Sequence, residues 1–165
     1  MRSRNYSVPI QVARSRGRPK VEPQGDNGYL SGEVFMSFTI EFDAKNNILR
    51  GTLKGQVTDA MLLDCYAVAA QCAALHPPCR GIWDFSAVTE FKVSNATIKQ
   101  AALRRPIISA GYMRVIVASH DFLFGMMRML QLLSEDARPE LVVVRTMQEA
   151  YQWLRVDAPD FAPVA

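Results

Sequence analysis

A histidine followed directly by an aspartate, His120-Asp121, is a pair of residues suited to acid–base chemistry. The pair comes just after an apolar run, and Asp84 ends another such run. Ligand sites in open α/β sheets collect beyond the carboxyl ends of strands, so we expect Asp84 to lie across a crevice from His120. Catalysis would also need a third group and a substrate pocket. The sequence has no nucleophile elbow, Gly-rich phosphate loop or paired acid motif. We therefore interpret His120 and Asp121 as first-turn helix residues of a protein that is not an enzyme, and keep an enzyme that uses them as the last alternative.

Three residues within a short span, Cys72, His76 and Cys79, have side chains that bind metals. Cys72 and His76 stand one helical turn apart, which makes half of a zinc site. A closed site needs a fourth ligand and a loop free to wrap around the ion, whereas Pro77-Pro78 stiffens this loop. We predict buried thiols that pack as small apolar groups, with no metal and no cofactor. Together with Cys65, three free thiols and no secretory signal favour a reducing cytoplasm.

Ser94 stands where a polar loop meets a helical segment, after the apolar run of residues 81–85. A serine at a helix N-terminus can hold a phosphate that the helix dipole and free N–H groups stabilise. Its simpler role is to cap the helix, and we favour that role. The loop between Ser86 and Ser94 trails a strand that we expect near the centre of the sheet. It is therefore the first candidate for a contact surface.

Residues 122–133 (FLFGMMRMLQLL) are apolar nearly all round, although a helix that covers a core needs one apolar stripe. Either the helix is wholly buried, or its second face contacts something else. Adaptable methionines suit an apolar ligand or a second subunit. The predicted surface for a ligand or partner combines this helix with the crevice residues and comprises Asp84, Ser86, Ser94, His120, Asp121, Phe124, Met127 and Arg128.

Hydrophobic periodicity predicts a single α/β domain over residues 35–156 with the order ββαβαβαβα. A hairpin at the sheet edge precedes three mostly parallel strands, which completes a mixed five-stranded sheet with helices on both faces. The predicted strands are residues 35–42, 48–54, 81–85, 113–118 and 141–144, and the predicted helices are residues 58–75, 94–105, 119–134 and 146–155. Thr58, Ser119 and Thr146 are the expected caps of three of these helices.

The segments outside this domain read differently. Residues 1–34 are rich in Arg, Pro, Gly and Ser and predict a disordered basic tail, and residues 157–165 predict a short C-terminal tail. The remainder has 13 of the 19 basic and 13 of the 16 acidic residues, so it is neutral. Within the tail, Arg16-Gly17-Arg18-Pro19-Lys20 resembles an AT-hook, in which Arg16 and Arg18 would lie in the DNA minor groove. We favour a solvated tail, or a true start at Met36.

The predicted central strand and the residues after it resemble the STAS domain family of bacterial anti-sigma-factor antagonists. Family members carry Asp-Leu/Phe-Ser-x-Val-x-Phe followed by Asp-Ser-Ser-Gly, and a partner kinase phosphorylates a serine of the second motif. Asp84, Phe85, Ser86 and Val88 match the first motif, and Phe91 matches with one extra residue. Residues 93–96 (VSNA) replace the second, so the resemblance offers Ser94 alone for the phosphorylated role.

A closer likeness is to a bacterial STAS-like branch that also resembles the CRAL-TRIO lipid-binding fold. Its pattern is similar to residues 117–121, Phe124-Gly125 and Arg128-Met129, and the last helix also looks like that branch. The resemblance implies the fold and leaves the task open. From it and the methionine-rich segment we expect a cytoplasmic, non-enzymatic binding or regulatory module that contacts proteins and associates with itself, or alternatively a carrier or sensor of an apolar small molecule or lipid. DNA is an expected partner only if the basic tail binds it.

Overall fold

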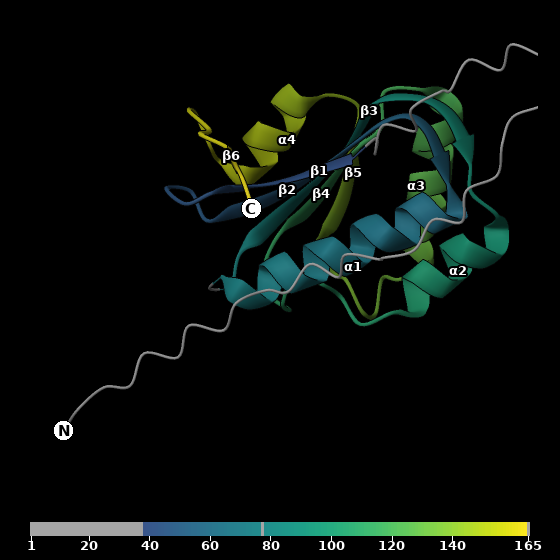
Figure 1. Ribbon diagram of the computed structural model, residues 1–165, viewed down its shortest axis with the longest axis horizontal. Helices are drawn as coiled ribbons and strands as arrows, with labels where there is room; N and C mark the ends of the chain where they lie inside the picture. Colours follow the sequence, from purple (N-terminus) through teal and green to yellow (C-terminus); the bar gives the residue numbers. More distant parts are fainter. Residues whose placement is uncertain (1–37, 77, 165) are drawn as a thin grey trace, which may run out of the picture. The chain divides into compact units, whose positions relative to one another are not determined.

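A single mixed β-sheet organises the part of the chain that the computed structural model describes, residues 38–76 and 78–164 (Figure 1). These residues form six strands and four helices, in the order β1 (Phe38–Asp43), β2 (Ile48–Thr58), α1 (Asp59–Leu75), β3 (Arg80–Lys92), α2 (Asn95–Leu103), β4 (Arg114–Val117), α3 (Asp121–Leu133), β5 (Leu141–Val144), α4 (Met147–Leu154) and β6 (Ala162–Pro163). The predicted α/β class is confirmed. None of the described helices is long and apolar enough to span a membrane.

The strands lie in the order β5-β4-β3-β2-β1-β6. β2, β3, β4 and β5 run parallel, whereas β1 is antiparallel to both of its neighbours. The predicted count of five strands is wrong, because β6 pairs with β1 through Phe42 and Ala162. The hairpin of β1 and β2 is therefore not at the edge of the sheet. β6 comes from residues 157–165, which the sequence predicted to be a tail.

β2 and β3 continue well beyond their predicted ends at residues 54 and 85 and stay paired as far as Thr58 and Lys92, with two shifts in register. The predicted loop after Ser86 is therefore strand in its first part. Val57 and Val88 are buried in this extension, and β-branched and aromatic residues favour a pleated, half-buried surface. The open loop expected to carry a contact surface is reduced to the short link before α2.

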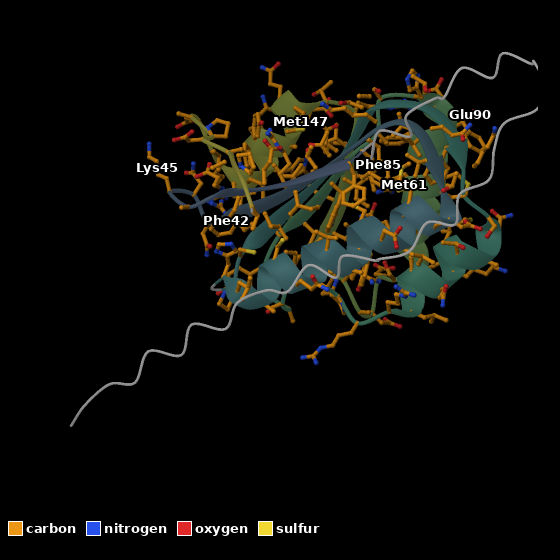
Figure 2. All side chains as sticks on the ribbon, in the orientation of Figure 1. Phe42, Lys45, Met61, Phe85, Glu90 and Met147 are labelled. Carbon is orange, nitrogen blue, oxygen red and sulfur yellow. The ribbon has the colours of Figure 1, made fainter. Side chains whose placement is uncertain are left out.

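The helices cover the two faces of the sheet unequally, with α1, α2 and α3 on one face and α4 on the other (Figure 1). Each of the first three connects a strand to its parallel neighbour in the direction of β5, and right-handed crossovers in one direction place their helices on the same face. Figure 2 shows Phe85 and Met61 on the side that α1 covers, and Met147 on the side of α4.

Three of the predicted helix caps are confirmed. The side chains of Thr58, Ser94 and Thr146 accept hydrogen bonds from the backbone N–H three residues on, and Thr146 forms a capping box with Glu149. The predicted cap at Ser119 is wrong, because α3 begins one residue later and its N-cap, His120, makes no side-chain cap bond. Ser119 instead donates its hydroxyl to the Ser86 carbonyl oxygen, 3.3 Å away.

Gly51 allows the ring of Trp83 to lie flat on β2. The two residues are partners in the parallel ladder, and a Cβ added at Gly51 would overlap the Trp83 ring. A side chain at residue 51 would displace that ring from the core face of the sheet. Gly51 is therefore required for packing and not for an unusual backbone angle.

We expect Gly51→Ala to lower the free energy of unfolding by about 1–3 kcal/mol, the range typical of overpacked cores. Gly125→Ala is the matched control, because a Cβ there meets nothing within 4 Å on α3. The control should raise stability by up to about 1 kcal/mol, as alanine favours helix over glycine. Urea unfolding of both variants measures the difference, and equal stabilities would contradict the packing role of Gly51.

Asp43 ties the turn after β1 to the segment that leads into β6. Its carboxylate, in a residue with no exposed surface, accepts hydrogen bonds from the Asn46 backbone N–H at 2.9 Å, the Asn46 amide at 2.7 Å and the Asp160 N–H at 3.0 Å. Burial acts to raise the pKa of Asp43, but these hydrogen bonds outweigh burial and lower the pKa below its ordinary value. The charged carboxylate is thus part of the folded state.

Because the pKa of Asp43 is lower in the folded chain than in the unfolded chain, its contribution to stability is complete above the unfolded pKa of about 4 and is lost as pH falls. We expect Asp43→Asn to cost about 1–3 kcal/mol at pH 7, because one buried acceptor is replaced by a donor. The stability of the variant should also fall less than that of the parent between about pH 5 and pH 3. Asp136→Asn, at an exposed residue, is the control. Parallel pH profiles for D43N and the parent would contradict the role of the charge.

Candidate functional site

The sequence predicted a crevice at the edge of the sheet where β4 and β5 end beside β3. Asp84 pairs with Val117, the last residue of β4, so its side chain stands at the carboxyl end of that strand pair. The Asp84 residue is only 9% exposed, and its Oδ1 accepts a hydrogen bond of 2.9 Å from the Ser86 N–H. The Ser119 hydroxyl lies at the same end of these strands, because it donates a hydrogen bond to the Ser86 carbonyl oxygen. The structure therefore brings Asp84 and Ser86 next to the segment that carries His120.

Arg145 is a residue at this edge that the sequence reasoning missed. It follows β5, and its Nη1 donates to the Ser119 carbonyl at 3.2 Å and to Asp121 Oδ1 at 2.7 Å. Its guanidinium lies 4.0 Å from the centre of the Phe124 ring, a cation–π contact. Ligand sites in open α/β sheets collect beyond the carboxyl ends of strands, and this rule pointed to Asp84 and His120. It applies equally to the residue after β5, so the sequence contained a signal for Arg145.

His120 and Asp121 do not form an acid–base pair. His120 is exposed, and in the part of the chain that the structure describes its side chain makes no hydrogen bond to cap α3. Asp121 directs its carboxylate to Arg145 instead, in an ion pair whose acidic member is 95% exposed. An ion pair this exposed contributes at most about 1 kcal/mol to stability. Asp121 is in the first turn of α3, as predicted, whereas His120 is the N-cap residue just before that turn.

Ser94 lies away from that crevice, because β3 runs on for several residues past Ser86. At about 3.3 Å per residue, the two serines are roughly 25 Å apart along the chain. Ser94 is exposed, its Oγ accepts from the Thr97 N–H at 3.2 Å, and its own N–H donates to Asp59 Oδ1 at 2.8 Å. That hydrogen bond is the main reason why the pKa of Asp59 is lowered. A phosphate on Ser94 would therefore meet the negative charge of Asp59.

The charge of Asp59 predicts how Ser94 responds to a negative substituent. Aspartate and asparagine are equally good helix caps, so Ser94→Asp and Ser94→Asn differ mainly in charge. We expect the Asp variant to have the lower unfolding midpoint at low ionic strength, and the gap to close in about 1 M salt, because salt screens exposed charges. Loss of the cap in Ser94→Ala should cost about 1 kcal/mol.

The comparison is repeated with Asp59→Asn, which removes the charge and keeps an acceptor for the Ser94 N–H. The gap between the Asp and Asn variants at residue 94 should then vanish at low salt as well. A gap of unchanged size in that background would mean that Asp59 does not oppose a charge at Ser94. Urea unfolding of the two residue-94 variants in both backgrounds, each at two salt concentrations, gives the eight midpoints needed.

α3 is not wholly buried. Leu123 and Met127 face the core, while Phe122 is 68% exposed and Leu133 is 50% exposed. Phe122, Met126, Met129 and Leu133 recur at intervals of four, three and four residues, so they form one stripe along the helix. The two ends of the stripe are exposed, whereas Met126 and Met129 are partly buried and pack against the edge of the core. We call these four residues the α3 stripe. An apolar second face is therefore present.

The α3 residues that the sequence predicted for the ligand or partner surface, Phe124, Met127 and Arg128, do not lie together on one side of the helix. Met127, at 1% exposed, faces the interior, where it lines the cavity described below, so of the predicted ligand or partner surface it can contact only a ligand inside the fold. Phe124 is half-buried under Arg145, and Arg128 is exposed with its guanidinium bonded to the Gln131 side chain. Neither of these two residues belongs to the stripe.

A cavity of about 100 Å³ lies between the sheet and the helices α1, α2 and α3. Its walls are mainly apolar and include Leu53, Trp83, Phe85, Ile98, Met127 and Leu130. Sequence reasoning placed an apolar ligand next to the methionine-rich helix but did not locate this space. The cavity depends on the relative positions of three helices and the sheet, which no local pattern encodes.

The cysteines are packed as the sequence predicted. Cys65, Cys72 and Cys79 are buried and free, and burial raises the pKa of Cys65 to about 12 and the pKa of Cys79 above its ordinary value. The His76 ring is stacked on Phe42 with ring centres 3.9 Å apart. Within the described ranges, no three His, Cys, Asp or Glu side chains are grouped for a metal ion. Arg16 and Arg18 lie outside the described residues.

A scan against protein-family models found no match for this chain, and a search of curated proteins found no similar sequence.

Proposed function

We propose that this protein is a non-enzymatic STAS-like binding and regulatory module that associates with itself through the α3 stripe. The observation that carries the proposal is the apolar stripe along α3, whose ends, Phe122 and Leu133, stay exposed although the helix already packs on the core. Apolar surface in a continuous strip favours a protein partner over water. The stripe's spacing matches the seam of a two-helix coiled coil.

A second copy of the chain is the partner that this spacing fits. The stripe residues are separated by four, three and four residues in either direction along α3, so the spacing is symmetric. An antiparallel pair of α3 helices about a two-fold axis would therefore place Phe122 against Leu133 of the second copy and Met126 against Met129. Such a contact uses the same patch on both subunits, which is the commonest arrangement in homodimers. Methionines tolerate the small adjustments in packing that a two-helix contact requires.

The STAS-like assignment is supported by the order of strands and helices and by the matching residues after the central strand. A phosphorylated Ser94 remains part of the proposal as a switch: its hydroxyl lies at an exposed helix N-terminus, while Asp59 opposes a phosphate there. The absence of catalysis is supported by the pairing of Asp121 with Arg145 and not with His120. The cytoplasm is the proposed location, on the grounds of the three free thiols.

Self-association is tested by a matched pair of substitutions. Leu133 and Leu75 are the last residues of α3 and α1, and both are at least half exposed. We expect Leu133→Lys to bring the mass in solution from twice the 18.5 kDa chain down to the chain itself, and Leu75→Lys to leave the dimer intact. Both lysines suit a helix C-terminus, so neither should weaken its helix.

Light scattering after gel filtration gives the masses of both variants and of the parent at several concentrations. A parent that remains monomeric at every concentration contradicts self-association. A dimer that survives Leu133→Lys shows that another surface forms it.

A carrier or sensor of an apolar small molecule is the second candidate function, and the cavity beneath α1, α2 and α3 favours it. An apolar cavity of about 150 Å³ in another protein stays dry and binds benzene. The present cavity is of similar order. The two functions are compatible, because none of the four stripe residues is among those that line the cavity.

A further inference from the structure

The cavity beneath α1, α2 and α3 and the surface groove beside it have a basic lining. Three arginines line the cavity and a fourth lines the groove, namely Arg104, Arg114 and Arg138, and Arg105. No Asp or Glu is among the described residues that line either space. Glu140 pairs with Arg114 from outside the lining and offsets one of these four charges. Because like charges gathered in this way attract anions and repel cations, the lining favours a negatively charged ligand.

The interior of the cavity has no available donor for a charged group. Both Nη atoms of Arg114 and of Arg138 already donate to protein oxygen atoms, at distances of 2.6 to 3.1 Å. Arg114 Nε has no hydrogen-bond partner in the described part of the chain, but it exposes less than 1 Å² of surface, so a ligand atom cannot reach it. A polar group buried without a partner is costly. The part of a ligand that enters this cavity must therefore be apolar, as most of the cavity walls are.

Arg104 lies at the opening of the cavity. It is the C-cap residue of α2 and is half-buried, whereas Arg114 and Arg138 are buried. Because Arg104 lines the cavity and also reaches solvent, its side chain borders both. Its guanidinium lies 5.4 Å from the centre of the Tyr66 ring and makes no hydrogen bond or ion pair with any described residue. The donors of Arg104 are thus available to a ligand at this opening.

The groove continues outward from the cavity. The two spaces share Tyr66 and the three residues 106–108, so one leads into the other. The segment between α2 and β4 that contains residues 106–108 is neither helix nor strand, so it can shift without breaking a backbone ladder. The groove is the larger space, with a volume of about 720 Å³, and the exposed Arg105 and Ser109 line it. It has room for the polar head of a ligand whose apolar end fills the cavity.

We infer that the protein binds a small amphipathic anion, with its apolar chain in the cavity and its acidic head in the groove, where the head accepts hydrogen bonds from Arg104. The volume of about 100 Å³ limits the enclosed part of the chain to roughly six carbon atoms, the size of a benzene ring. This inference rests on the second candidate function and narrows it from any apolar small molecule to an anion with a short apolar chain.

Trp83 lines the cavity and reports the arrival of a chain, whereas the other tryptophan, Trp153, is more than half exposed on α4. The full chain carrying Trp153→Phe is titrated with octanoate and octyl phosphate, and with 1-octanol and octylammonium as neutral and cationic counterparts, all below the concentrations at which they form micelles. We expect octanoate to give a saturable change in Trp83 fluorescence and octylammonium to bind at least about tenfold more weakly, because of the basic lining. The tighter of the two anions identifies the head group.

Arg104→Gln tests the contact with the head, and Lys99→Gln is its control on the same helix. Both substitutions remove one positive charge from α2, but Lys99 is exposed and lines neither space. R104Q should lower octanoate affinity about 3–10-fold and leave 1-octanol affinity unchanged, whereas K99Q should change neither. Ala101→Leu narrows the cavity from α2 and should abolish the response to every probe. Thermal unfolding of each variant confirms that it is folded before its titration is interpreted.

The outcomes separate the inference from the function on which it rests. Equal affinity for octanoate and octylammonium overturns the preference for an anion and leaves an apolar carrier. Equal octanoate affinity in folded R104Q and K99Q overturns the role of Arg104, and unchanged affinity in folded A101L overturns the placement of the chain in the cavity. No response of Trp83 to any probe overturns the inference and the carrier together, whereas self-association through the α3 stripe is decided by the masses alone.

Discussion

The parallel pairing of β2 with β3 is the constraint on which the other features depend. The two strands stay paired from Ile48 and Arg80 to Thr58 and Lys92. Because they end together, α1 and α2 begin close to each other, and Asp59 in the first turn of α1 accepts the Ser94 N–H at the start of α2. The same pairing fixes Trp83 over Gly51 and so places an aromatic wall under three helices. The helix starts and the floor of the cavity thus follow from one ladder.

Buried guanidiniums hold together the side of the molecule opposite those helix starts. Arg138 joins the stretch after α3 to the last turn of α2, and Arg114 joins the beginning of β4 to the loop after α2 and to Glu140. An apolar residue in either place would leave several carbonyls without donors, which is costly in a buried region. This arrangement positions α2 but concentrates positive charge beside an apolar space. The cost is tolerated because each charge meets several acceptors, and at Arg114 Nε the arrangement is incomplete.

Local signals in the sequence predicted the elements more reliably than their extent. The capping box at Thr146 and Glu149 specifies its helix within a few residues, and both α4 and its cap were found. The predicted cap at Ser119 was wrong, because the Ser119 hydroxyl is engaged in a tertiary contact with Ser86.

The elements that were missed depend on residues far apart in the sequence. β6 is held by a short ladder with β1 and by the hydrogen bond from the Asp160 N–H to the Asp43 carboxylate. The end of β3 was missed because its last residues are strand only while β2 lies beside them. For the same reason the cavity and the partners of Arg145 could not be predicted, since each requires side chains from elements that no sequence pattern connects. Only the place of Arg145 at the end of β5 could have been read from the sequence.

α3 contributes to both features that we propose for binding, the cavity and the α3 stripe. Met127 and Leu130 line the cavity, and Met126 and Met129 lie beside them on the helix, partly buried at the edge of the core. Packed interiors transmit changes in volume, because their side chains have few alternative positions. A ligand larger than the cavity would therefore displace wall residues such as Met127 or Leu130, and any shift of the helix backbone would move the α3 stripe with it. Coupling between two sites requires that a ligand bind two arrangements of a shared element with different affinity. α3 meets the structural part of that requirement, because a rotation of the helix changes the wall of the cavity and the alignment of the stripe at the same time.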